Sequence, residues 1–230
     1  MTTQSALFEA QLVPLVEGRA RVIAAFAWQH MKAAVTFRDH VIAIESENAE
    51  RQFGPFFEDL RTYGSACIMS AAASLETLIN ESFINPGGSL RGMLKDFESD
   101  FWGRGGIEWK PPLEKYQVAL KMLGRPPFNE SVAPFRETWA LIELRNALVH
   151  YKPTWDPDRQ RKVELVEVLD GKYEVSPFVD AGADFVTMKS MSSGCARWVI
   201  ATALAFMKEF HVRAELDEHK KMAAFWKLGS

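Results

Sequence analysis

Apolar residues recur every three or four positions along most of this chain, and this spacing predicts amphipathic helices. Long helices are predicted over residues 5–50 (with a break near Pro14 and Gly18), 55–84, 111–123, 135–151 and 195–215. Shorter helices are predicted within 90–109, ahead of a Gly-rich loop, and within 217–228. The alanines of 55–84 allow a neighbouring helix to approach closely. The pattern therefore predicts an all-α bundle with this helix near its centre.

One segment follows a different pattern. Residues 163–175, VELVEVLDGKYEV, alternate apolar and polar positions around Asp170 and Gly171. Asp-Gly between two alternating runs is a strong hairpin signal. We therefore expect one small β-hairpin inserted on a helical body.

Helix 135–151, FRETWALIELRNALVHY, carries an arginine within its apolar surface. The neighbours of Arg145 at three and four residues in both directions are Leu141, Ile142, Leu148 and Val149. Residues at these spacings share a helix surface. A buried charge without a partner costs several kcal/mol, so Arg145 needs a partner of opposite charge.

The same helix carries a polar line made of Glu143, Asn146 and His150. Five residues of helix turn by about 500° and rise by about 7.5 Å, so Arg145 and His150 point about 140° apart. Within one helix they cannot easily contact the same small group. They can flank a common groove if the helix packs against a second copy of itself.

Length and composition indicate an ordinary globular chain. With 230 residues, 47% of them hydrophobic and 25% charged, and no evident linker, we expect a single domain over 1–230. The net charge of −3 means that nucleic-acid binding would need a local basic patch. Cys67 and Cys195 lie far apart and are expected to be buried and reduced, with a disulfide the less favoured alternative. The start of the chain lacks a signal-peptide pattern and no apolar run is long enough to span a bilayer, which favours the cytoplasm and no membrane association.

Several kinds of chemistry lack their sequence patterns. There is no HExxH motif, no CxxC pair and no serine-nucleophile elbow, so neither a metal site nor a cofactor is predicted. The GRGG loop at 103–106 lacks the spacing of a phosphate-binding loop. Glu76 and Asn80, one turn apart on helix 55–84, belong either to a solvated face or to a substrate-binding site.

The segment from Arg145 to His150, RNALVH, resembles the R-x4-6-H motif of the HEPN domain superfamily. SLETLINESF, within helix 55–84, is similar to the first core helix of such domains. The resemblance covers about 55–151 plus 193–216, and leaves out the N-terminal helical extension 5–50 and the hairpin. It implies a HEPN-like helical bundle that forms a homodimer, with two such motifs facing each other.

The resemblance also implies a metal-independent endoribonuclease of the toxin or defence type, with RNA as substrate and an antitoxin or regulatory protein as a possible partner. His150 would act as general acid or base, Arg145 would stabilise the charge on the phosphate, and Asn146 would orient either one. The resemblance does not extend to Tyr151, which is given no role as the acceptor of a transferred nucleotide. A local positive field for RNA would come from Lys152, Arg159, Arg161 and Lys162.

Two other interpretations remain open. A non-catalytic HEPN-like module would bind a nucleotide or a protein partner, with Arg145 neutralised by Glu76 and His150 capping its helix. An adaptor acting through the hairpin would need neither residue for chemistry.

Overall fold

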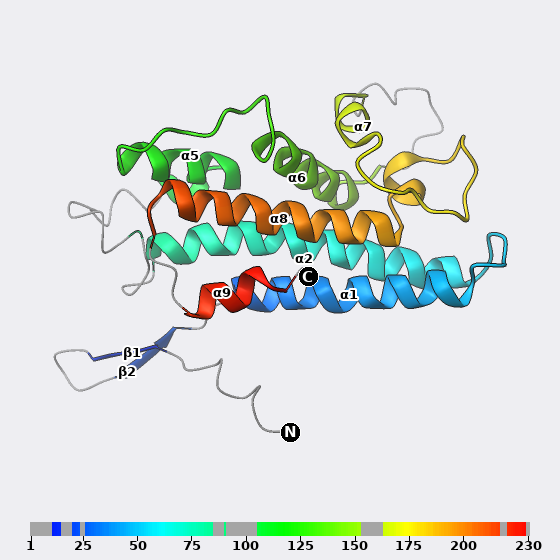
Figure 1. Ribbon diagram of the computed structural model, residues 1–230, viewed down its shortest axis with the longest axis horizontal. Coiled ribbons are helices and arrows are strands. Elements are labelled where there is room, and N and C mark those ends of the chain that lie inside the picture. Colours follow the sequence, from blue (N-terminus) through cyan, green and yellow to red (C-terminus); the bar gives the residue numbers. More distant parts are fainter. Residues whose placement is uncertain are drawn as a thin grey trace.

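Three long helices lie side by side at the centre of the protein (Figure 1). They are α1 (Ala27–Glu47), α2 (Phe56–Ile84) and α8 (Ser193–Arg213), and each contacts the other two. The structure is a computed structural model that describes residues 11–14, 20–23, 26–84, 90, 105–152, 163–216 and 220–228. In this part of the chain the fold is mostly helical, as the apolar spacing predicts.

Shorter elements surround the three long helices. Helices α5 (Pro112–Met122) and α6 (Phe135–Val149) both contact α2, and α6 also contacts α8. Helix α7 (Val163–Leu169) and a π-helical segment, η4 (Phe185–Lys189), lie against α6. The remaining elements are a 3-10 turn, η2 (Ile107–Trp109), helix α9 (Lys220–Trp226), and an antiparallel strand pair, β1 (Gln11–Pro14) and β2 (Ala20–Ile23).

Carboxylates of the long helices bind the starts of their neighbours. A carboxylate oxygen of Glu81, near the end of α2, accepts hydrogen bonds from the backbone N–H groups of Phe26 and Ala27, where α1 begins. Glu45, near the end of α1, accepts one from the N–H of Ser193, where α8 begins. The first N–H groups of a helix lack partners within the helix, so these contacts fix the ends of the bundle relative to each other.

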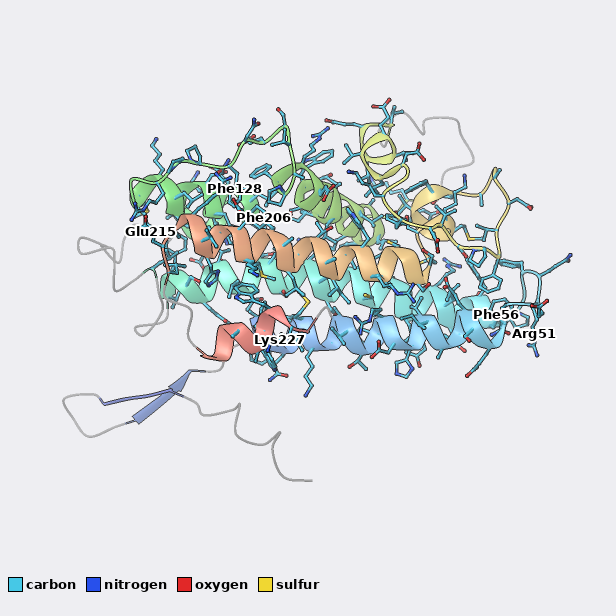
Figure 2. All side chains as sticks on the ribbon, in the orientation of Figure 1. Arg51, Phe56, Phe128, Phe206, Glu215 and Lys227 are labelled. Atoms are coloured by element: carbon cyan, nitrogen blue, oxygen red, sulfur yellow. The ribbon has the colours of Figure 1, made fainter. Side chains whose placement is uncertain are left out.

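Aromatic side chains fill both ends of the bundle (Figure 2). The rings of Phe128 and Phe206 stack 4.7 Å apart at one end. At the other end the rings of Phe56 and Phe178 meet edge to face at 4.8 Å. Tyr116 is fully buried between helices, and its hydroxyl donates to the carbonyl oxygen of Leu75. Such buried rings supply much of the apolar area that stabilises a domain of this size.

The prediction of a β-hairpin at 163–175 is wrong. Residues Val163–Leu169 form helix α7, whose buried side chains are Leu165 and Leu169, one turn apart. Gly171 follows α7 with φ +69°, a left-handed conformation that ends a helix as readily as it turns a hairpin. The Asp-Gly pair therefore marks a helix end here.

The predicted helix over 5–50 is also wrong in its first half, because strands β1 and β2 lie within 11–23 and α1 begins only at Ala27. The other long helices agree with the prediction within a few residues. Ser192 caps α8, its hydroxyl accepting a hydrogen bond from the N–H of Cys195 at 3.0 Å.

Candidate functional site

Helix α6 leaves the core toward its C-terminus. Its last fully buried residue is Leu144, whereas Val149 is 51% exposed. The backbone N–H of His150 donates to the carbonyl oxygen of Asn146 at 2.9 Å, and the helix ends there. The Arg145–His150 segment therefore lies on the surface of the chain.

Arg145 faces α2 and forms an ion pair with Glu76. The closest guanidinium nitrogen and carboxylate oxygen are 3.7 Å apart, and the side chains are 26% and 41% exposed, respectively. A pair this long and this accessible to water contributes at most about 1 kcal/mol to stability. Arg145 is thus less buried than its apolar neighbours suggest.

Glu76 and Asn80 also face a second cation, Lys115 of α5. The Nζ of Lys115 donates to Oδ1 of Asn80 at 2.9 Å, and the residue is 2% exposed. Burial lowers the pKa of Lys115, and the nearby charges of Glu76 and Glu108 oppose that shift. The polar pair on α2 therefore lies between cations of the same chain.

The remaining candidates on α6 and just beyond it are accessible. Asn146 is partly exposed, and its Nδ2 donates to Oε1 of Glu143 at 3.2 Å. His150 and Lys152 are both exposed. The structure thus pairs Arg145 of α6 with Glu76 of α2, pairs Asn80 with Lys115 of α5, and leaves His150 at the end of α6. Three predicted basic residues, Arg159, Arg161 and Lys162, lie outside the described residues.

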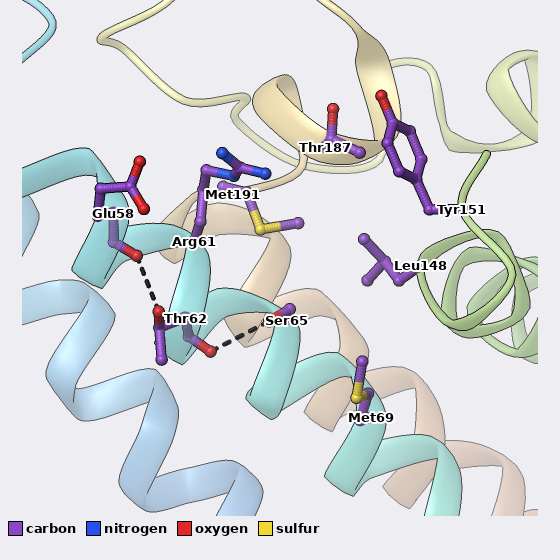
Figure 3. Close-up of a pocket in the computed structure, with 9 residues that line it drawn as sticks. All are labelled: Glu58, Arg61, Thr62, Ser65, Met69, Leu148, Tyr151, Thr187 and Met191. Atoms are coloured by element: carbon purple, nitrogen blue, oxygen red, sulfur yellow. Dashed lines mark hydrogen bonds between the residues drawn. The ribbon is translucent and has the colours of Figure 1, made fainter. Parts of the chain in front are cut away.

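A groove opens beside the end of α6 (Figure 3). Its volume is about 320 Å³, near the lower limit of about 300 Å³ for small-ligand sites. Leu148 and Tyr151, which flank the candidate His150 in sequence, form one side. Thr187 of η4 and Met191 line the groove between Tyr151 and Arg61. The opposite side belongs to the first half of α2 and consists of Glu58, Arg61, Thr62, Ser65 and Met69.

None of the residues that line this groove is among the candidate site residues predicted from sequence. One signal was available, because Glu58, Thr62, Ser65 and Met69 recur every three or four residues and so share one face of α2. No local pattern links them to Thr187, which reaches the groove through η4. There a carboxylate oxygen of Asp184 accepts hydrogen bonds from both the N–H and the hydroxyl of Thr187.

The two cysteines are buried and free, as predicted. Burial raises the pKa of Cys67 to about 12 and also raises that of Cys195, so both thiols stay protonated and poorly nucleophilic. Within the described residues no three His, Cys, Asp or Glu side chains gather as metal ligands. None of the described helices is both long enough and apolar enough to cross a bilayer.

Comparison of the chain with protein-family models, with curated proteins and with solved structures found no match.

Proposed function

We propose that this protein is a HEPN-like, metal-independent endoribonuclease of the toxin or defence type that acts as a homodimer. The observation that carries the proposal is the accessibility of the motif. Arg145 keeps 26% of its side chain exposed and forms a long ion pair with Glu76, and His150 is exposed at the helix end. An arginine with a structural role would be expected to have a closer partner. A histidine with a structural role would be expected to have a buried partner.

Self-association is supported by the apolar surface around the motif. Val149, directly before His150, is 51% exposed. Packing this surface against its copy would remove apolar area from water and bring two motifs together. Because Arg145 and His150 diverge on their own helix, a site that uses both needs the second subunit.

In the proposed reaction the ribose 2′-oxygen attacks the adjacent phosphorus. One His150 imidazole accepts the 2′-hydroxyl proton as the bond from the 2′-oxygen to phosphorus forms. The protonated imidazole of the same His150 then donates this proton to the 5′-oxygen as the bond from phosphorus to the 5′-oxygen breaks, so each site needs one His150 and the Arg145 of the second subunit. The products are a 2′,3′-cyclic phosphate and a 5′-hydroxyl, and Arg145 stabilises the negative charge on the phosphoryl oxygens.

The test is cleavage of single-stranded RNA in EDTA. His150→Ala and Arg145→Ala are each expected to lower the rate at least about 100-fold, the usual contribution of a general acid–base group or a charge-stabilising donor. Arg136→Ala removes another ion-paired arginine of α6, and His40→Ala another exposed histidine, so both are matched controls. Cleavage that survives both test substitutions would overturn the proposal.

A second candidate function is a non-catalytic HEPN-like module that binds a nucleotide or a protein partner. The observation that favours it is the Arg145–Glu76 ion pair, which gives the arginine a partner within its own chain. In this case the wild type does not cleave RNA, and Arg145→Ala and His150→Ala alter only stability or binding.

A further inference from the structure

The groove beside α6 has side chains of complementary chemistry on its sides. Arg61 carries the positive charge, and no described residue forms an ion pair with it, not even Glu58 one turn earlier. Its guanidinium extends from α2 toward the side formed by Thr187 and Tyr151 (Figure 3). An arginine in this position can donate two parallel hydrogen bonds to a phosphate.

Three hydroxyl groups of the groove can accept hydrogen bonds from a ligand. The Thr62 hydroxyl donates to the carbonyl oxygen of Glu58, and the Ser65 hydroxyl donates to that of Thr62. The Thr187 hydroxyl donates to Asp184. Because these three hydrogens are already used, the three oxygens offer lone pairs to a ligand. A bound molecule with N–H or O–H donors suits them.

The remaining surface suits a flat ring. Tyr151 is 45% exposed, and Met69, at 39%, lies across the groove on α2. Leu148 and Met191 add further apolar surface to the groove. Bases stack on aromatic side chains with about 1–3 kcal/mol per base. A ligand that fits the arginine, the hydroxyl groups and the apolar surface combines an anionic group, several N–H or O–H donors and an aromatic ring. A nucleotide has these groups.

We propose that this groove binds one nucleotide of a single-stranded RNA, with its phosphate on Arg61 and its base against Tyr151. This inference rests on the proposed function, since Leu148 and Tyr151, which line the groove, lie on either side of His150 in the sequence. The groove is open at the surface, so the strand can continue on both sides. Single-stranded RNA presents its bases unpaired for such stacking, whereas a duplex does not.

The test uses methionine methyl signals in NMR spectra of the full chain. Met69 and Met191 line the groove, whereas Met31 and Met207 are fully buried in the core and serve as internal references. The probe is a 2′-O-methyl RNA hexanucleotide, which lacks the attacking hydroxyl and so is not cleaved. We expect it to shift the Met69 and Met191 signals and to leave the two core signals in place.

Substitutions then identify the contacts. Arg61→Gln and Tyr151→Leu are each expected to weaken hexanucleotide binding about tenfold, while Tyr151→Phe keeps the ring and the affinity. Arg51→Gln removes an exposed arginine outside the groove and is the matched control. Unchanged binding in Arg61→Gln and Tyr151→Leu, or unmoved Met69 and Met191 signals at saturation, would overturn the inference. So would 5′-AMP binding as tightly as the hexanucleotide, which would assign the groove to a free nucleotide.

The result of this binding test can be distinguished from the result of the cleavage test. If the wild type binds the hexanucleotide in the groove but does not cleave RNA, the binding site stands and the nuclease proposal fails. If His150→Ala abolishes cleavage while the groove variants bind and cleave like wild type, the nuclease stands and the binding site fails.

Discussion

The ion pair between Arg145 and Glu76 is the contact on which the two candidate functions differ most. Its nitrogen–oxygen distance of 3.7 Å and its exposure make it weak, so Glu76 holds the arginine loosely on the surface of α2. Glu76 also lies near Lys115, and that buried cation gives the carboxylate a second partner. The need for a carboxylate near Arg145 follows from the sequence. The degree of exposure does not, because it depends on where α6 leaves the core.

Glu76→Gln tests this contact directly. Because both side chains are partly exposed to water, we expect the free energy of unfolding to fall by less than about 1 kcal/mol. Affinity for the 2′-O-methyl RNA should stay the same or increase, because a carboxylate that competes with phosphate for Arg145 is removed. Urea unfolding and RNA titration measure the two quantities. Glu164→Gln, which removes the partner of Arg136 on the same helix, is the control.

A marked loss of stability in Glu76→Gln, with no change in RNA affinity, would favour the non-catalytic module. In that case the carboxylate serves mainly to neutralise Arg145 and Lys115.

At the scale of elements, the start of α8 forms one of the closest backbone contacts described. A Cβ placed on Gly194 would lie 2.4 Å from the carbonyl oxygen of Glu174. The hydroxyl of Ser192 donates to that same oxygen at 2.7 Å. The segment before α8 is therefore held directly against the turn that follows α7, and Met191, next to it, lines the groove.

Gly194→Ala is expected to destabilise the protein by about 1–3 kcal/mol, because the added methyl group overlaps backbone atoms that cannot simply rotate away. Gly182→Ala is the matched control, since a Cβ there meets nothing within 4 Å and φ is not positive. Urea unfolding of both variants measures the difference. Equal stability of the two variants would mean that the contact at Gly194 is looser than described.

The wrong prediction of a β-hairpin at 163–175 also concerns a single element. In VELVEVLDG, Leu165, Val168 and Leu169 stand at helical spacing while the flanking residues alternate, so a short segment satisfies both periods. Contact with α6 favours the helix, and this contact is invisible in the local pattern. Long helices such as α2 and α8 repeat the helical period over many turns and so leave no such ambiguity.

At the scale of the whole molecule, the features that the sequence predicts are local, whereas those it does not predict combine segments that are distant in the sequence. The motif from Arg145 to His150 lies within one helix and can be found in the sequence. The groove beside it combines residues from α2, from the end of α6 and from η4 to Met191. Only the packing of these segments brings Arg61, Tyr151 and Thr187 together, so no spacing rule predicts the groove.

The divergence of Arg145 and His150 predicts a specific result for mixed dimers. If each site takes Arg145 from one subunit and His150 from the other, an Arg145→Ala chain paired with a His150→Ala chain restores one intact site per mixed dimer. Random exchange makes half of the dimers mixed, so the mixture should recover about a quarter of wild-type cleavage, although each variant alone is inactive. Native mass spectrometry of chains with different tags confirms that exchange has occurred. If mixed dimers form and cleavage does not return, the two residues do not combine across the interface, and the subunit arrangement proposed for the nuclease is wrong.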